Sequence, residues 1–238
     1  MTDEERPGDR EVERLRSTSR YSVWVGIAFV IVIAIASYNA FTGDEGGLLG
    51  ADASAAGDPL PEFAVPELPG GKEADANVFQ DDCDSSEIPC PPEEKRTPAC
   101  EVDLPKVLRV CDFFDRPLVL SFWFTSPSGC PPTQDLVDAA ARRYRGKVGF
   151  LSVAVRGERE ELERIIRERG WTMPVGWDRD GAVSNLYRVG GCPTVAFVLP
   201  GGILSEAKIG TGELDHGALE DAIEELLRES RRRAEATR

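Results

Sequence analysis

The sequence predicts an α/β domain, a mixed sheet flanked by helices, preceded by a single transmembrane helix. Two observations support this prediction. From Arg116 onward, patterned segments follow the order strand, helix, strand, helix, strand, strand, helix. Crossovers in that order give parallel strands, and the closing hairpin gives an antiparallel edge. Nearer the N-terminus, residues 22–41 form a run of 20 residues without a charged side chain.

The uncharged run is long enough to cross a membrane. At about 1.5 Å per residue, a helix over residues 22–41 covers a hydrocarbon core of about 30 Å. Tyr21, Trp24 and Tyr38 lie near its ends, where aromatic rings suit the membrane interface. We therefore expect an uncleaved transmembrane helix over residues 21–41. A cleavable signal peptide is the competing interpretation, since small residues lie near the end of the run.

Basic residues set the orientation of that helix. Five arginines occur in residues 1–20, and no lysine or arginine follows the helix before Lys72. Because positive charge is retained on the cytoplasmic side, we expect residues 1–20 to be a cytoplasmic tail. The rest of the chain is then extracytoplasmic, as in a single-pass protein of a bacterial cell membrane.

Length and charge limit the possible functions. At 238 residues, the chain accommodates one compact core plus appendages. The formal net charge is −14 at pH 7, and nearly all of the excess acid lies beyond residue 20. Such an acidic surface repels phosphate backbones and has no patch of basic residues to bind them, so no nucleic-acid partner is expected.

Two segments without a regular pattern follow the membrane helix. Residues 42–61 are rich in Gly, Ala, Asp and Pro and have no apolar period, which is typical of a flexible linker. Residues 62–112 form a Cys- and Pro-rich N-terminal extension that carries four of the six cysteines.

These four cysteines, Cys83, Cys90, Cys100 and Cys111, indicate structural disulfides. Their number is even, they are expected outside the cytoplasm, and cross-links replace a core in small exported segments. Three connectivities are possible, of which pairing 83 with 90 and 100 with 111 is the most local. Their spacing matches no familiar zinc pattern and no histidine lies among them, so no metal is expected.

The patterned domain is expected over residues 113–232. Residues 117–124 and 148–155 are continuous apolar runs, which are typical of strands buried on both faces. Residues 132–144 and 158–169 place apolar side chains on one face of a helix.

The C-terminal half continues this pattern. Residues 180–187 form a weaker helical stretch. Residues 194–199 and 203–209 flank a Pro-Gly-Gly sequence and indicate a hairpin. Residues 213–232 have an amphipathic helical period and close the domain.

Two short motifs support a family resemblance. The run Leu120-Ser-Phe-Trp-Phe124 leads into a Cys-Pro-Pro loop, and Cys192-Pro193-Thr194 stands at the start of the first hairpin strand. With the element order, these motifs resemble the thioredoxin superfamily over residues 59–229. The N-terminal anchor resembles the TlpA-like, membrane-tethered branch of that superfamily.

The resemblance implies a thioredoxin-like fold and a site. In the superfamily, the proline at the position of Pro193 is cis and faces the redox loop, and a cis bond is a minority state that the fold must enforce. Pro193, Trp123 and Thr125 are thereby implied as residues that contact a substrate. For Trp123, a core position is the commoner alternative.

The redox loop departs from the family pattern. Members carry Cys-x-x-Cys after the first buried strand, whereas residues 125–133 read Thr-Ser-Pro-Ser-Gly-Cys-Pro-Pro-Thr. Counted without gaps, Cys130 matches the second family cysteine; with three extra loop residues it matches the first, and Thr133 replaces the second. Pro131 suits a first helical turn, which favours the longer loop and puts Cys130 at the helix N-cap. There the helix dipole favours thiolate over thiol.

The same loop also resembles the Thr-x-x-Cys loop of peroxiredoxins, the redoxin (AhpC/TSA-like) group. This resemblance implies a thiol peroxidase in which Thr125 polarises the peroxide. However, Thr125 stands five residues before Cys130 instead of three, and no arginine is assignable by motif.

Three functions remain open from the sequence. The first is an exported thiol-disulfide oxidoreductase, without a cofactor, that acts on protein thiols or disulfides through Cys130 and uses Cys192 as the resolving partner. The second is a thiol peroxidase that uses Cys130. The third is a redox-inactive thioredoxin-fold module that binds a partner beside Pro193. A bond between the two cysteines would also serve as a structural staple.

Overall fold

The computed structural model describes residues 24–31, 33, 56–78, 97–125, 130–210 and 214–236. The chain divides into two units, residues 1–45 and 46–238. In the first unit, residues 24–31 and 33 are helical and exposed. Among the described residues, no helix has both the length and the apolar character needed to span a membrane. The predicted tail at 1–20 and most of the predicted span at 21–41 lie outside the described residues.

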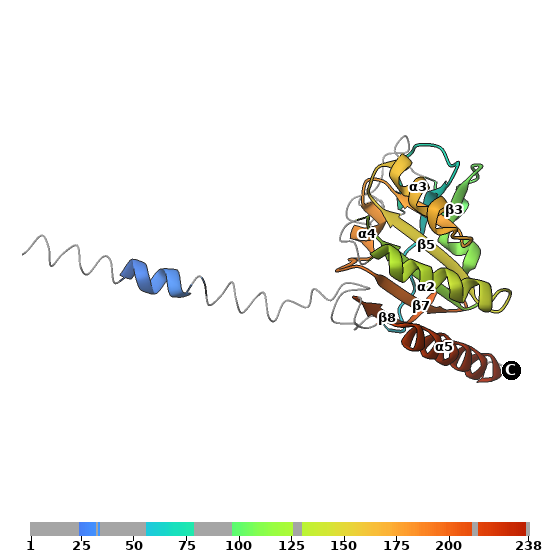
Figure 1. Ribbon diagram of the computed structural model, residues 1–238. Helices are drawn as coiled ribbons and strands as arrows, with labels where there is room; N and C mark the ends of the chain where they lie inside the picture. Colours follow the sequence, from blue (N-terminus) through green and yellow to red (C-terminus); the bar gives the residue numbers. More distant parts are fainter. Residues whose placement is uncertain are drawn as a thin grey trace, which may run out of the picture. The chain divides into compact units, whose positions relative to one another are not determined.

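The second unit is built on a mixed sheet (Figure 1). Its strands are β1 (Phe63–Leu68), β2 (Asn77–Val78), β3 (Val107–Arg109), β4 (Leu118–Trp123), β5 (Gly149–Val155), β6 (Val175–Asp178), β7 (Thr194–Leu199) and β8 (Ile203–Ile209). Across the sheet they follow the order β2-β1-β6-β5-β4-β7-β8, and β3 also pairs with β1. Strands β4, β5 and β6 are mutually parallel, whereas β1 and β7 run antiparallel to β6 and β4. The predicted mixed sheet is confirmed.

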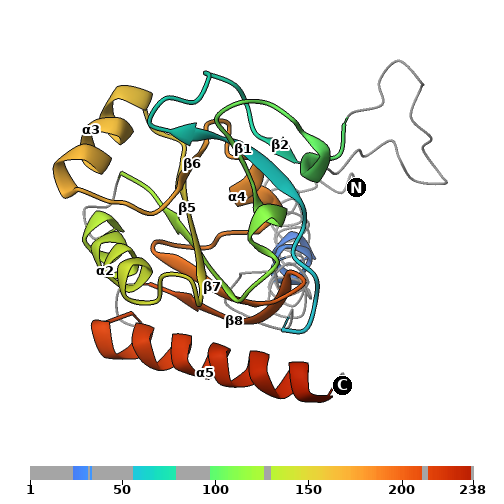
Figure 2. The ribbon, with the colours of Figure 1, turned by 90° about the vertical axis from the view of Figure 1, so that its right-hand side faces the viewer.

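Helices cover both faces of this sheet. They are α2 (Cys130–Arg143), α3 (Arg159–Arg169), α4 (Ala182–Leu186) and α5 (His216–Ala236), with short 3₁₀ turns η2 (Ala99–Glu101) and η3 (Val110–Phe113). Figure 2 shows α2 and α3 on one side of β5 and α4 on the other. The apolar sides of α2, α3 and α5 belong to one core cluster, and α4 belongs to a second.

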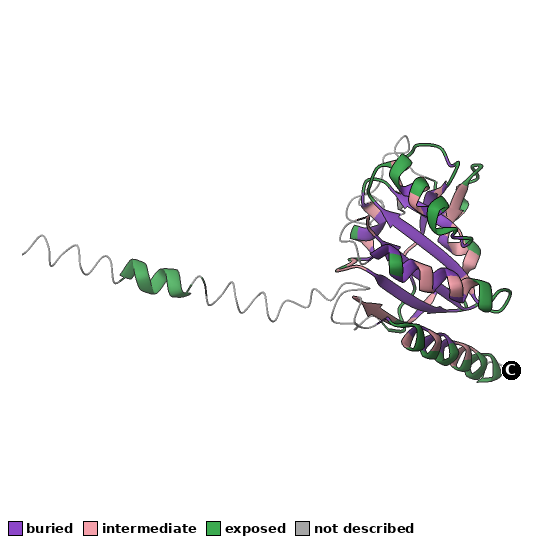
Figure 3. Ribbon diagram, viewed as in Figure 1, coloured by how far each residue is buried: buried purple, intermediate pink, exposed green. Residues whose placement is uncertain are grey.

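The central strands are buried on both faces, as their continuous apolar runs predict. Every residue of β4 is buried, and its side chains alternate between the two clusters, with Val119 and Trp123 in one and Leu118 and Leu120 in the other. Figure 3 shows the same contrast between buried strands and exposed outer helix surfaces. This sheet is the rigid support on which the loops at its edge are positioned.

The N-terminal extension takes part in the sheet. Residues 62–112 were expected to precede the domain, but β1 pairs with β6 through Glu67 and Leu68, and Phe63 and Val65 lie fully inside the second core cluster. The predicted boundary at 113 therefore does not separate two structural parts. Pro66 interrupts the strand pattern of the sequence FAVPEL, which explains why this strand was not predicted.

The end of the predicted flexible linker is also ordered against the domain. Leu60 is buried, and its amide donates to the carbonyl of Gly202 over 2.8 Å. The amide of Gly57 donates to the carbonyl of Leu204 over 2.8 Å, and Pro59 forms an isolated bridge with Ile203. Residues 57–60 thus pack along the turn before β8 and the start of β8, because backbone groups there find partners in both.

The predicted hairpin is present as β7 and β8. Its turn contains Gly201 and Gly202, whose φ angles of 85° and 78° are unfavourable for other residues. A side chain at Gly202 would also lie 2.7 Å from the ring of Phe114. The turn therefore favours glycine at both positions, and the close approach of Phe114 also requires it at Gly202.

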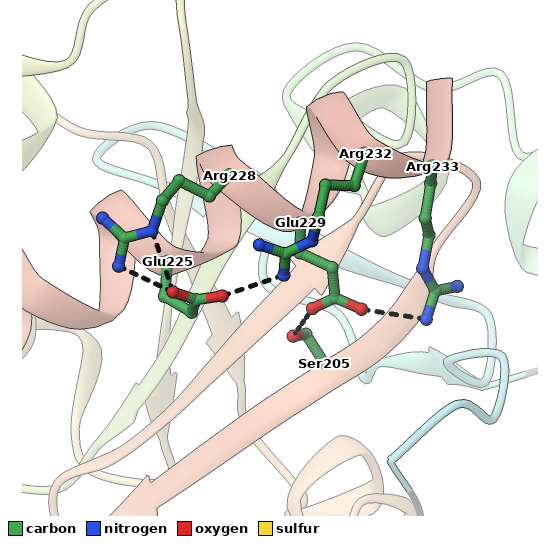
Figure 4. Close-up of polar contacts among 6 residues, drawn as sticks. All are labelled: Ser205, Glu225, Arg228, Glu229, Arg232 and Arg233. Atoms are coloured by element: carbon green, nitrogen blue, oxygen red, sulfur yellow. Dashed lines mark hydrogen bonds and ion pairs between the residues drawn. The ribbon is translucent and has the colours of Figure 1, made fainter. Parts of the chain in front are cut away.

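Helix α5 continues to Ala236, past the predicted end at residue 232. Its last turns carry ion pairs of Glu225 with Arg228 and Arg232, and of Glu229 with Arg233 (Figure 4). The pairs three and four residues apart, Glu225 with Arg228 and Glu229 with Arg233, stabilise the helix by a few tenths of a kcal/mol each. Glu229 also accepts a hydrogen bond from Ser205 Oγ at 2.6 Å, which ties the helix to β8.

Candidate redox site

The site lies where β4, α2 and β7 meet. Strand β4 ends at Trp123, and α2 begins at Cys130. Because β4 and β7 are antiparallel with Phe122 opposite Thr194, the residues just before Thr194 lie beside the end of β4. The strand register therefore brings two distant cysteines together.

The structure joins Cys130 and Cys192 in a disulfide with 5.7 Å between their Cα atoms. That distance lies within the range of about 4.4–6.8 Å that a disulfide requires. Cys130 is the first residue of α2, so the helix includes the residue that was expected at its N-cap. Thr133, the residue that replaces a second cysteine in the longer-loop alignment, is buried on the first turn of the same helix.

The turn that carries Cys192 is held by hydrogen bonds. The Cys192–Pro193 peptide is cis, as the resemblance implied, and Pro193 is buried. Thr194 Oγ1 donates to the carbonyl of Gly191 over 2.7 Å. The amide of Gly210 donates to the carbonyl of Pro193 over 2.8 Å. The turn with the second cysteine is thus held by the first residue of β7 and by the residue that follows β8.

The two cysteines differ in exposure. Cys130 has 0% exposed surface and belongs to the core cluster of α2, α3 and α5. Cys192 packs against that cluster but is partly exposed. Of the two residues of the disulfide, Cys192 is therefore the one that offers surface to solvent.

The resemblance also implied Trp123 and Thr125 as residues that contact a substrate. Trp123 is fully buried and meets Trp171 edge to face, with ring centroids 5.1 Å apart, so it occupies the core and offers no surface to a substrate. Thr125 is half-buried, and its methyl group lies against Gly157 in the loop after β5.

A buried polar cluster lies one helical turn from the disulfide and was not predicted. Gln134 of α2 is fully buried, and its Oε1 accepts hydrogen bonds from Ser121 Oγ at 2.9 Å and Ser152 Oγ at 3.1 Å. The serines stand opposite each other on β4 and β5. The sequence held two signals of this cluster. Each apolar strand run contains a serine, and the apolar face of the helix contains a glutamine. The cluster is neutral, so it adds no charge beneath Cys130.

A buried carboxyl group lies at the end of β6. Asp178 accepts amide hydrogen bonds from Val183 at 3.0 Å and Ser184 at 2.8 Å, so it holds the first residues of α4. Burial raises the pKa of Asp178, and the two backbone bonds oppose that effect. Its hydrogen bonds identify it as a structural group.

The second disulfide of the described residues joins Cys100 and Cys111, with Cα atoms 5.8 Å apart. It links η2 to η3, and Arg109 Nη1 donates to the carbonyl of Cys100 over 3.4 Å. Cys83 and Cys90 lie outside the described residues.

The same two sulfurs and a carboxylate oxygen of Glu62 lie within 4.8 Å of one another. Metal ligation requires free thiolates, and both sulfurs are in the disulfide. The group is therefore a cross-link in this state.

Comparison with known proteins bears on the fold of the domain. No family model matches the chain. A structure of a putative thiol:disulfide interchange protein DsbE from Chlorobium tepidum is similar with a TM-score of 0.54, at 18% identity, over 72% of this chain and 97% of the other. The domain has a thioredoxin-like fold. A putative protein disulfide isomerase from Bacteroides thetaiotaomicron is also similar, with a TM-score of 0.53, at 13% identity, over 75% of this chain and 94% of the other.

One curated relative is similar to the chain in sequence. The thiol-disulfide oxidoreductase ResA of Oceanobacillus iheyensis is 31% identical over 116 residues, which are 48% of this chain. The match spans 60% of the length of that relative.

Proposed function

We propose that the protein is a membrane-anchored, extracytoplasmic thiol-disulfide oxidoreductase whose redox-active disulfide joins Cys130 and Cys192. The observation that carries the proposal is the place of this disulfide. One cysteine begins a helix of 14 residues, the other precedes a cis proline, and one of the two is partly open to solvent. A bond that served only as a staple would need none of these features.

The chemistry is a two-electron exchange with protein thiols or disulfides. A substrate thiolate attacks one sulfur of the disulfide, forms a mixed disulfide and releases the other sulfur as a thiolate. A second substrate thiol then closes the substrate disulfide and leaves both protein cysteines reduced. The positive end of the α2 dipole stabilises a thiolate at Cys130. The names of the similar proteins, ResA and DsbE, support this reaction class.

The test is redox equilibration of the full chain in glutathione buffers of varied ratio. The fraction of reduced Cys130 and Cys192 is measured by alkylation and mass mapping. We expect a reversible two-electron transition for this pair. Cys100→Ser with Cys111→Ser is the matched control and should leave the transition unchanged. A pair that stays oxidised at every ratio while the protein remains folded would instead support the redox-inactive, partner-binding module.

The anchor is part of the proposal and is supported by the uncharged run at residues 22–41 and the arginines before it. A reporter fused after Arg238 should report the extracytoplasmic side. The protein should also stay with the membrane after alkaline carbonate extraction. A cytoplasmic reporter signal would contradict the proposed localisation.

A further inference from the structure

The difference in exposure between the two cysteines gives them different roles. Resting on the proposed function, we infer that exchange enters through Cys192: the incoming thiolate attacks Cys192 Sγ, and Cys130 leaves as the thiolate. Sequence reasoning assigned the opposite roles, with Cys130 as the reactive thiol and Cys192 as the resolving partner. That assignment used the helix position alone, whereas burial decides which sulfur a substrate reaches.

Access to the sulfurs supports this order. An attacking thiolate must approach a disulfide sulfur from the side opposite the leaving sulfur. Cys130 has 0% exposed surface, so its sulfur offers no such path while α2 stays packed. Cys192 is partly exposed, and it follows Gly190, which is exposed, and Gly191, which has no side chain to cover it. A protein substrate can therefore approach Cys192 without moving the helix.

The leaving group supports the same order. Exchange is faster when the sulfur that leaves is the better stabilised thiolate. Cys130 is the first residue of α2, where the positive end of the helix dipole stabilises negative charge. Cys192 lies in a turn before β7 and has no helix behind it. Attack at Cys192 thus expels the sulfur whose charge the α2 dipole stabilises, while the burial of Cys130 opposes that effect.

The electrons and bonds balance in both directions. When the protein oxidises a dithiol substrate, the substrate–Cys192 bond forms, the Cys130–Cys192 bond breaks, and its electron pair goes to Cys130. The second substrate thiolate then attacks the substrate sulfur and releases Cys192 as a thiolate. In the reverse direction, Cys192 attacks a substrate disulfide, and Cys130 resolves the mixed disulfide. The intermediate on Cys192 is the same in both cases.

The experiment compares Cys130→Ser and Cys192→Ser in the full chain, with glutathione disulfide as the probe at neutral pH. We expect the Cys192 thiol of C130S to form its mixed disulfide at least about tenfold faster than the Cys130 thiol of C192S, because access limits the rate. In denaturant the two rates should become similar, which assigns the difference to the fold. Equal rates in the folded proteins, or a faster Cys130, would overturn the inference.

A second measurement needs no variant and so does not depend on whether either variant folds. Oxidised wild-type protein is mixed with a small excess of glutathione, quenched with an alkylating reagent and mapped by mass spectrometry. The glutathione adduct is expected on Cys192, and an adduct mainly on Cys130 contradicts the inference. If the pair does not equilibrate with glutathione at all, the proposed function fails. If it equilibrates through Cys130, only the assigned order fails.

Discussion

The hydroxyl of Tyr187 donates a hydrogen bond to the carbonyl of Pro61 over 2.6 Å. The bond joins the residue after α4 to the segment just before β1, across 126 positions of the sequence. The ring of Tyr187 is fully buried between Phe63 and Phe122. The N-terminal segment is therefore fastened to the core of the thioredoxin-like domain at this point.

Replacing Tyr187 with Phe tests that contact. The ring contacts remain, but the carbonyl of Pro61 loses its donor in a partly buried site. We expect the free energy of unfolding to fall by about 1–2 kcal/mol, measured from the urea midpoint. Tyr144→Phe, which removes a hydroxyl bonded to the exposed carboxylate of Glu224, is a matched control and should cost less. Equal losses would show that burial does not strengthen the Tyr187 bond.

The same tyrosine should make stability depend on alkaline pH. Burial raises the pKa of Tyr187 well above its ordinary value. A raised folded pKa means that the stabilisation is complete below the unfolded pKa of about 10 and is lost as pH rises further. Above that pH, the unfolding free energy of wild type should fall faster than that of Y187F, by up to about 1.4 kcal/mol per pH unit. Parallel curves would contradict this shift.

Gly176→Ala probes the contact between β6 and β1. A Cβ at Gly176 would lie 2.3 Å from Val65 Cγ2, so we expect a loss of about 1–3 kcal/mol from overpacking. Gly190→Ala, where nothing lies within 4 Å, is the control. In a double-mutant cycle, Val65→Ala should cost less in the G176A background than in wild type, since it removes the clashing methyl. Strictly additive losses would mean that Val65 is not the obstacle.

The Cys100–Cys111 disulfide should contribute stability without contributing to exchange. It closes a loop with a sequence separation of 11, for which the chain-entropy model gives about 3 kcal/mol. Replacing both residues with Ser leaves no odd thiol. We expect a lower denaturant midpoint under oxidising conditions and an unchanged rate of reaction with glutathione. A slower reaction would link this cross-link to the Cys130–Cys192 site.

Periodicity was sufficient for the long elements and insufficient for the short ones. The apolar runs of β4, β5 and β7 and the amphipathic periods of α2, α3 and α5 are strong local signals, and those elements are confirmed. Strands β1 and β6 were not predicted. Pro66 breaks the pattern of β1, and β6 has only four residues, one of them Gly176. Both strands depend on partners that are distant in the sequence.

The redox site could also be predicted only in part. The resemblance implied both that Cys130 and Cys192 come together and that the bond at Pro193 is cis. Their unequal exposure could not be predicted, because the burial of Cys130 depends on core residues that are distant in the sequence. Gln134 was missed for the same reason. A glutamine on an apolar helix face can be explained only when the structure shows the two serines that donate hydrogen bonds to it.

The pairing of β1 with β6 affects how the domain should be produced as a recombinant fragment. A protein that started at residue 113 would lack β1, β2 and β3, and the amide and carbonyl groups of β6 that face β1 would become an open edge. It would also uncover the apolar surface that Phe63 and Val65 now fill. Open edges beside apolar surface recruit strands from other molecules, so such a fragment should aggregate. A fragment that starts before Gly57 keeps the edge closed.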